Sequence, residues 1–214
     1  MPPTDAAKPL TLTEQARRAQ LIGVTITLVA EHGYPGTSLA RIAEAAGISK
    51  AAVLYHFPSK DAVVRAAYAS VLDGVVAQVG AAVEGRDGAA ALEAYLRSMA
   101  GYMREHPDHA RMIIEALIAD TGTPQGPGRH ETVAALVTAA ADAGDYRPDV
   151  DVRTTAIIIN GALDAIVTES LADPAFDTAH AAEQLILMLS RSFGSQRKTH
   201  AGDSGRDSDH DHAA

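Results

Sequence analysis

The sequence predicts an all-α protein of about nine helices, in which a short N-terminal unit of three helices precedes a longer helical body. Three observations support this fold class. Hydrophobic residues make up 47% of the 214 residues but aromatic residues only 4%, a composition that favours helices packed through Ala, the residue with the highest helix propensity. Apolar residues recur at spacings of three and four positions. Gly, Pro or a capping Ser, Thr or Asp separates these periodic segments.

The first helix is expected from Leu12 to His32. Thr11 and Glu14 have the spacing of a capping box, in which each side chain accepts a hydrogen bond from the other residue's backbone. Gly33 ends the helix, because glycine adopts the left-handed conformation found at helix ends. Residues 24–28 alternate like a strand, but helix formers flank them and no turn residue intervenes, so we favour helix.

Eight further helices follow, separated by residues that break helices. Two short helices occupy residues 38–46 and 50–56, and a long one capped by Ser59 occupies residues 60–84. Pro107 separates the next two, because the residue before proline avoids helical geometry. The predicted bounds of the last five helices are residues 89–105, 108–120, 129–143, 150–172 and 177–194.

These elements group into four parts. Residues 11–60 form the three-helix unit and residues 61–194 the body, while residues 1–10 are expected to be a flexible arm and residues 195–214 a disordered tail. Residues 1–60 carry six Lys or Arg against four Asp or Glu, a net charge of +2 within a chain of net charge −9. The other residues therefore carry −11, and positive potential is concentrated at the N-terminal end.

The most informative segment runs from Ser38 to Phe57. Its first half has apolar residues at i, i+3, i+4 and i+7, which are Leu39, Ile42, Ala43 and Ala46. Gly47 supplies a tight turn, and Ser49 caps a second short helix. The outward side chains of that second helix are Lys50, Ala51, Ala52, Tyr55 and His56. Two short helices joined by a glycine turn form a helix-turn-helix, whose second helix enters the major groove of DNA.

Several further features stand at fixed spacings around this motif. They are Ala30-Glu31-His32-Gly33-Tyr34, Ile42-Ala43, Ala46-Gly47-Ile48-Ser49, Tyr55-His56-Phe57 and Pro58-Ser59-Lys60. With them, the chain resembles the TetR family of helix-turn-helix transcriptional regulators. The likeness is close over residues 14–75; beyond them it extends only to the helical layout and an Arg147-Pro148-Asp149 turn. It implies an N-terminal helix-turn-helix domain followed by a C-terminal domain for ligand binding and dimerisation.

The resemblance also implies which residues contact DNA. Base edges or neighbouring phosphates are met at Ser49, Lys50 and Ala52, and phosphate is held near a helix N-terminus. Two departures matter: Leu54 stands where an aromatic residue is usual, and the methyl groups of two alanines can meet thymine methyls but donate no hydrogen bonds. The expected DNA-binding residues are Thr37, Ser38, Ser49, Lys50, Ala51, Ala52, Tyr55, His56 and Lys60.

Bulky apolar and amphipathic residues recur at helical spacing in the body, where the resemblance implies a ligand cavity among the central helices. Methionine suits such a cavity because its side chain is flexible and adaptable. The alternative is that these residues form an ordinary core. The candidate ligand-binding residues are Tyr68, Leu72, Tyr95, Met99, Tyr102, Met103, Met112, Leu117 and Asn160.

The body offers no catalytic constellation. The chain has no Cys, which excludes disulfides, thiolate metal sites and a Cys nucleophile, and it has neither a Gly-x-Ser-x-Gly elbow nor a Gly-rich phosphate loop. His106, Asp108 and His109 with the pair His130-Glu131 are the alternative that would bind a cation, but Pro107 breaks the helix that would align the first of them. We expect no enzyme, no cofactor and no bound metal.

The helix at residues 150–172 is apolar on nearly every face, more than one-sided burial requires. A second chain is expected to cover the surplus face, where Gly161, Ala162 and Ala165 allow close approach. The last helix would contribute the stripe Ala182, Leu185, Ile186, Leu189 and Phe193. No uninterrupted apolar run reaches the roughly 18 to 20 residues that span a bilayer, and the first residues do not form a signal peptide, so we expect a cytoplasmic protein without a membrane partner.

These features predict a sequence-specific regulator of transcription. A homodimer would bind a palindromic operator in double-stranded DNA as a repressor, and an unknown small-molecule effector would release it. The alternative is a helical small-molecule-binding protein or enzyme without DNA binding, which would have no reason to keep residues 37–60. A purely architectural DNA binder would not need so large a helical body.

Overall fold

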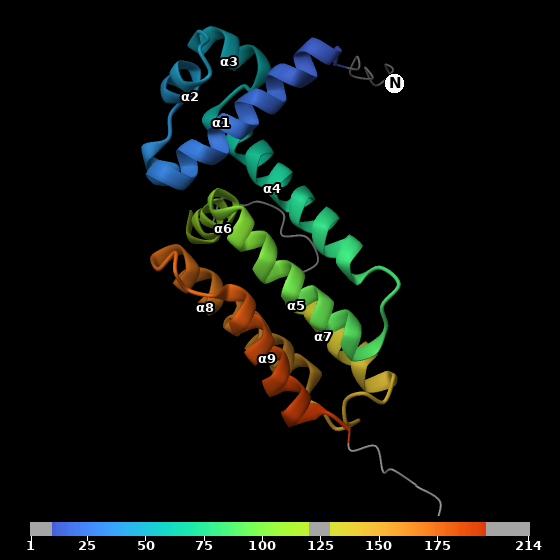
Figure 1. The fold of residues 1–214 in the computed structure, drawn as a ribbon. Coiled ribbons are helices and arrows are strands. Elements are labelled where there is room, and N and C mark those ends of the chain that lie inside the picture. Colours follow the sequence, from blue (N-terminus) through green and yellow to red (C-terminus); the bar gives the residue numbers. More distant parts are fainter. Residues whose placement is uncertain (1–9, 120–128, 196–214) are drawn as a thin grey trace, which may run out of the picture.

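The computed structural model describes residues 10–119 and 129–195, with side chains described for all of these except residues 116–119 and 129. This part of the chain forms nine helices, and its only β-structure is one isolated bridge between Tyr146 and Gly194. The predicted all-α fold of about nine helices is confirmed (Figure 1). In chain order the helices are α1 (Leu12–Gly36), α2 (Leu39–Ala45), α3 (Lys50–His56), α4 (Lys60–Val83), α5 (Gly88–Glu105), α6 (Pro107–Ala119), α7 (Arg129–Asp142), α8 (Val152–Ala172) and α9 (Thr178–Phe193).

The first helix differs most from its predicted bounds. Its N-terminus carries the expected capping box, with the amide of Glu14 donating to Thr11 Oγ1 and the amide of Thr11 donating to Glu14 Oε2. Gly33 leaves helical geometry as predicted, at φ 68° and ψ 171°, but one more helical turn follows and carries the element to Gly36. The other helices begin and end within two residues of the predicted positions.

The helices α1–α3 form a head that lies at one end of the elongated molecule (Figure 1). Its core consists of fully buried apolar side chains from all three helices and from the start of α4. They include Ile42, Val53 and Phe57, which helical periodicity places on the inner faces, together with Leu21 and Val63. Leu54, which the same periodicity places inside, is instead 42% exposed. The head therefore closes around the inner faces of α2 and α3, and the outer face of α3 stays exposed.

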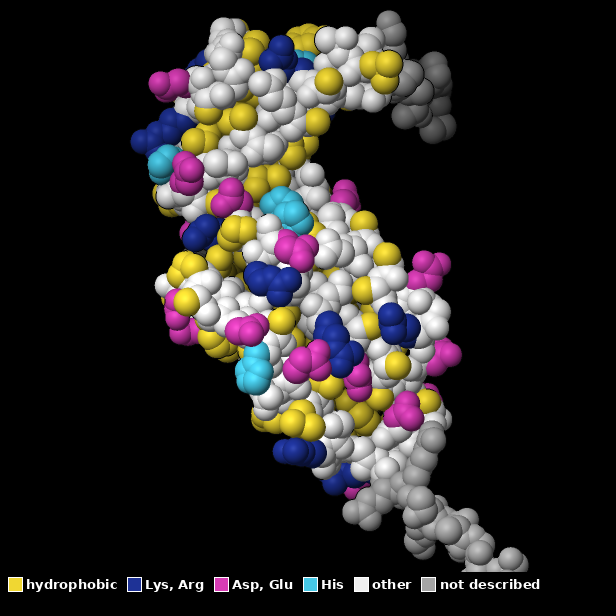
Figure 2. Space-filling model, viewed as in Figure 1, with side chains coloured by type: hydrophobic (Ala, Val, Ile, Leu, Met, Phe, Trp, Pro, Cys, Tyr) yellow, Lys and Arg dark blue, Asp and Glu magenta, His cyan; other side chains and the backbone are white. Residues whose placement is uncertain are grey.

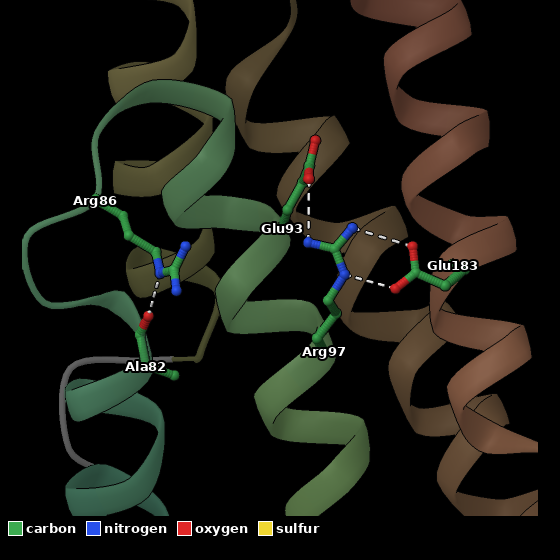
Figure 3. Close-up of polar contacts among 5 residues, drawn as sticks. All are labelled: Ala82, Arg86, Glu93, Arg97 and Glu183. Atoms are coloured by element: carbon green, nitrogen blue, oxygen red, sulfur yellow. Dashed lines mark hydrogen bonds and ion pairs between the residues drawn. The ribbon is translucent and has the colours of Figure 1, made fainter.

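The helices α4–α9 form the body, whose core is built mainly by α5, α7, α8 and α9 around Leu92, Leu96 and Val137. In Figure 3, Arg97 of α5 reaches across to α9: its Nε and Nη2 donate to the Glu183 carboxylate at 2.5 and 3.0 Å, and its Nη1 donates to Glu93 at 3.1 Å. The figure also shows Arg86, whose Nε donates to the carbonyl of Ala82 at the end of α4. Both contacts are exposed, so each stabilises the fold only modestly.

A separate apolar cluster joins the head to the body. It combines Ile26 and Val29 of α1 with Val71 of α4 and Met112 of α6, and its other buried members are Val64, Ala67 and Tyr68. Met112 is only 1% exposed. The helix α6 therefore packs directly under α1, as Figure 1 also shows.

Two helices, α4 and α8, are long and apolar enough to cross a membrane by length and composition alone. The sequence reading missed them because scattered polar residues interrupt every apolar run. Core helices of soluble proteins pass the same test, so this property is weak evidence for a membrane.

Candidate nucleic-acid interface and the junction behind it

The helix-turn-helix forms through the local interactions that its sequence predicts. Ser38 Oγ accepts a hydrogen bond from the amide of Arg41 at 3.2 Å, and Ser49 Oγ accepts one from the amide of Ala52 at 3.1 Å. Each serine thus satisfies a backbone donor that a helix start leaves free. Gly47 has φ 67°, the left-handed conformation that the turn between α2 and α3 requires. The caps and the turn together fix how α3 projects from the head.

The outer face of α3 carries Lys50, Ala51 and Tyr55 on the surface, with Ala52 and His56 half-buried. Tyr55 is 74% exposed, but its hydroxyl donates to Glu14 Oε1 at 3.0 Å. This hydrogen bond ties α3 to the start of α1 and raises the pKa of the Tyr55 phenol. Three of these five side chains are therefore exposed, together with Ser49, on one short helix, and the other two are half-buried.

Arg18 of α1 also contacts the C-terminal end of α3. Its guanidinium lies 4.1 Å from the centre of the Phe57 ring and donates to the backbone carbonyl of His56. A positive charge at the C-terminal end of a helix is favourable, because the carbonyls there carry partial negative charge. The sequence reading missed Arg18, because nothing in its spacing shows that it lies near residues 56 and 57.

Two of the expected phosphate-binding residues contact the end of α1. Thr37 is 2% exposed, and its hydroxyl donates to the carbonyl of Gly33 at 2.9 Å. Lys60 is half-buried, with its Nζ donating to the carbonyl of Tyr34 at 3.0 Å and lying 3.7 Å from the centre of the Tyr34 ring. An ammonium has three donors, so Lys60 can bind Tyr34 and still offer hydrogen bonds to an anion. Ser38 remains exposed.

The junction behind the head centres on Tyr34. Its amide donates to Glu115 Oε2 of α6 at 3.0 Å, and its hydroxyl donates to Asp61 at the start of α4. Desolvation and the Asp61 carboxylate that accepts this bond both raise the pKa of Tyr34, with the hydrogen bond the larger cause. Three segments that are far apart in the sequence, α1, α4 and α6, therefore meet at the side chain and backbone of Tyr34.

The candidate ligand-binding residues do not gather in one place. Tyr68 and Met112 belong to the cluster between head and body, with Leu72 packed against it. Tyr95, Tyr102 and Met103 are buried in the body core, with Met99 packed against that core. Asn160 is also buried, and its Nδ2 donates to the carbonyl of Ala156. The side chain of Leu117 lies outside the described residues.

One cleft of about 290 Å³ opens between head and body. It is lined by Gly23, Ile26 and Thr27 of α1 and by residues 105–109 at the junction of α5 and α6, so none of the candidate ligand-binding residues lines it. Among these lining residues, the rings of His106 and His109 stack with centres 4.9 Å apart. His109 Nδ1 also lies 2.7 Å from Tyr102 Oη. Burial and then the neighbouring His106 lower the pKa of His109.

The described residues contain no group of three or more His, Cys, Asp or Glu side chains placed to hold a metal ion. On the face shown in Figure 2, acidic and basic side chains are interspersed over the body.

Residues 21–67 match the family model described as bacterial regulatory proteins of the tetR family. The matched segment contains α2, the turn, α3 and the junction residues Tyr34 and Lys60. Residues 21–67 therefore belong to a domain of the tetR family. Among curated relatives, it is 32% identical over 104 residues to the HTH-type transcriptional regulator RutR of Escherichia coli strain K12, a match that covers 49% of each chain. The chain therefore spans about half the length of this relative.

Solved structures of the TetR family share the fold over most of the chain. A TetR family transcription regulator from Marinobacter aquaeolei VT8 superposes with a TM-score of 0.70 at 22% identity, covering 86% of this chain and 98% of the other. The regulator FadR from Bacillus subtilis, solved in complex with stearoyl-CoA, superposes with a TM-score of 0.65 at 17% identity and covers 80% and 96% of the two chains. At these identities the likeness extends to the fold alone.

Proposed function

We propose that this chain is a sequence-specific DNA-binding regulator of transcription of the TetR family. The observation that carries the proposal is α3, a short helix that is capped by Ser49, held at its C-terminal end by α1 and exposed along one face. An α-helix presented in this way fits the major groove, where each base pair shows a distinct pattern of donors and acceptors. The alternative, a helical small-molecule binder or enzyme without DNA binding, gives this exposed face no role.

The contacts with DNA divide into two kinds. Ser49, Lys50, Ala51 and Ala52 lie on the first turn of α3 and would face base edges or neighbouring phosphates. Ser38 at the start of α2 and Lys60 at the start of α4 would hold the backbone on either side, because helix N-termini and ammonium groups attract phosphate. The remaining phosphate contacts in this proposal are Thr37, Tyr55 and His56.

A homodimer is supported by apolar side chains that the monomer leaves exposed. On α8 these are Ile157 and Ile158, at 48% and 59% exposed, and on α9 they are Leu187 and Met188, at 38% and 64%. The expected α9 stripe instead lies inside the monomer, where Leu185, Ile186 and Leu189 belong to the body core. A second copy of the chain is the natural cover, and it would present two α3 helices to a palindromic operator.

The body supplies the sensor in this proposal. A repressor released by a small-molecule effector is consistent with the fold shared with FadR, whose structure contains stearoyl-CoA, and with the large body behind the head. We further propose a cytoplasmic protein that acts by binding and not as an enzyme.

Selection from a random-sequence DNA library tests the function. The full chain is mixed with duplexes and competitor DNA, and bound molecules are amplified over several rounds. We expect enrichment of one palindromic sequence, with half-sites about one helical turn (~34 Å) or a multiple apart. The variant Lys50→Ala serves as the comparison, because it should bind the enriched duplex more weakly. A library that stays random after selection would favour the alternative.

A further inference from the structure

We propose that Glu115 of α6 is a positioning residue that couples the body to DNA binding, acting through the backbone N–H and carbonyl of Tyr34. The proposal rests on the proposed function, because it concerns residues expected to contact DNA. Glu115 accepts a hydrogen bond from the backbone of α1, and it lies 81 residues from its partner in the sequence.

Tyr34 connects different parts of the molecule through its backbone N–H and its backbone carbonyl, which belong to the two peptide groups flanking its Cα. Its N–H donates to Glu115 Oε2 at 3.0 Å. Its carbonyl accepts from Lys60 Nζ at 3.0 Å and from the backbone amide of Thr37 at 3.3 Å. Two expected phosphate contacts thus depend on a residue whose other side is held by the body.

Gly33 makes the approach of Glu115 possible. A Cβ at this position would lie 3.0 Å from Glu115 Oε2, closer than nearly all such contacts in proteins. Its φ of 68° and ψ of 171° lie in a region that essentially only glycine adopts. The same residue's carbonyl accepts from the Thr37 hydroxyl. This backbone conformation at Gly33 brings the Glu115 carboxylate to the Tyr34 amide and the Thr37 hydroxyl to the Gly33 carbonyl.

The position of Glu115 follows that of α6 as a whole. Met112 stands three residues earlier, on the same face of the helix, and is buried against α1 and α4. Ala110 of the same helix is buried in the body core. A shift of α6 caused by a ligand in the body would thus move both its apolar anchor in the head and the acceptor of Tyr34. This path runs beside α4, the helix that leads from the head into the body.

Thermodynamic coupling gives the expected direction. Glu115 orders the backbone of Tyr34, whose carbonyl holds Lys60 and Thr37. Its loss therefore leaves these residues to be ordered when DNA binds, and binding becomes weaker. Coupling is reciprocal, so DNA that fixes Lys60 and Thr37 should in turn stabilise the contact of Tyr34 with Glu115 and slow hydrogen exchange in α6. If Glu115 acted only as a negative charge near phosphate, its removal would instead tighten binding.

The test is a double-mutant cycle on the full chain with the duplex enriched by selection. We expect Glu115→Ala to lower affinity about fivefold or more, as for a typical coupling between sites, but less than about twofold when Lys60→Ala is already present. Glu115→Gln keeps an oxygen acceptor for Tyr34 and should restore most of the affinity. Asp108→Ala removes the same charge from the same helix and should behave as the wild type.

Hydrogen exchange of residues 107–119, measured with and without the duplex, provides the second readout. The wild type and Asp108→Ala should show slower exchange when DNA is bound, whereas Glu115→Ala should lose this response while still binding. The proposal is overturned if Glu115→Ala lowers affinity equally with and without Lys60, or if hydrogen exchange in both Glu115 variants responds to DNA as it does in the wild type. Either result would leave DNA binding itself intact. A wild type that binds no duplex would overturn the proposed function itself.

Discussion

Replacing Gly33 by Ala is expected to destabilise the protein well beyond the usual effect of a surface substitution. The backbone there, at φ 68° and ψ 171°, costs a non-glycine residue about 1–3 kcal/mol. The new methyl group would also stand 3.0 Å from Glu115 Oε2. The carboxylate can rotate away, but it then gives up its hydrogen bond to the Tyr34 amide, and a lost hydrogen bond costs about 1 kcal/mol. The sum is about 2–4 kcal/mol.

Gly80→Ala is the matched control. Gly80 lies in the interior of α4 with no heavy atom within 4 Å of an added Cβ. The same substitution should therefore stabilise the helix by about 0.5–1 kcal/mol, because alanine has less conformational entropy to lose than glycine. The two variants add one identical methyl group and are expected to change stability in opposite directions.

Urea unfolding at one fixed protein concentration measures both variants, and the concentration is held constant because dimer stability depends on it. In thermal unfolding, about 2–4 kcal/mol corresponds to a fall in Tm of roughly 4–16 °C for a chain of this size. If Gly33→Ala were neutral or stabilising, the backbone conformation at Gly33 and the contact with Glu115 would both be refuted as described.

Three further predictions concern charge, assembly and pH. Lys60→Ala should weaken binding to all duplexes alike and reduce the slope of log affinity against log salt concentration by about one unit. Lys50→Ala should also cost about 1–3 kcal/mol of discrimination at one base pair. If the salt dependence of both variants equals that of the wild type, the proposed docking is contradicted. Ile158→Asp should convert the dimer to monomer in sedimentation experiments, while Val76→Asp on α4, where the wild-type side chain is 70% exposed, should not; a dimer that survives both would place the interface elsewhere. Burial and then His106 lower the pKa of His109, so the folded state resists protonation of this side chain. This contribution to stability is present above about pH 6.5 and is lost as pH falls through the folded pKa. His109→Gln should flatten the dependence of the urea midpoint on pH in this range, and an unchanged profile would assign the dependence to other groups.

The sequence predicted the parts of the structure that depend on local signals. The bounds of every helix but the first, the caps at Thr11, Ser38 and Ser49, and the positive φ of Gly33 and Gly47 follow from neighbouring residues, and all are observed, the bounds to within two residues. The packing of the inner faces of α2 and α3 follows from helical periodicity in the same way. These signals were sufficient to find the helix-turn-helix.

Contacts between distant segments were not predictable in this way. Nothing in the spacing of Glu115 shows that it meets Tyr34, and the only signal that could have pointed there was a glycine needed at position 33. Periodicity identified the apolar stripe of α9 correctly but not its partner, since Leu185, Ile186 and Leu189 pack in their own chain. Seven of the nine candidate ligand-binding residues lie in or against apolar clusters, and the structure divides them between two such clusters.

The central claim is that α3 gives this protein sequence-specific binding to DNA. The most direct measurement is a titration of the full chain with the selected duplex and with a scrambled duplex of the same length and composition, both at physiological salt. The account predicts that the selected duplex binds at least about 10³-fold more tightly, the lower end for specific DNA-binding proteins. Equal affinities for the two duplexes would contradict it.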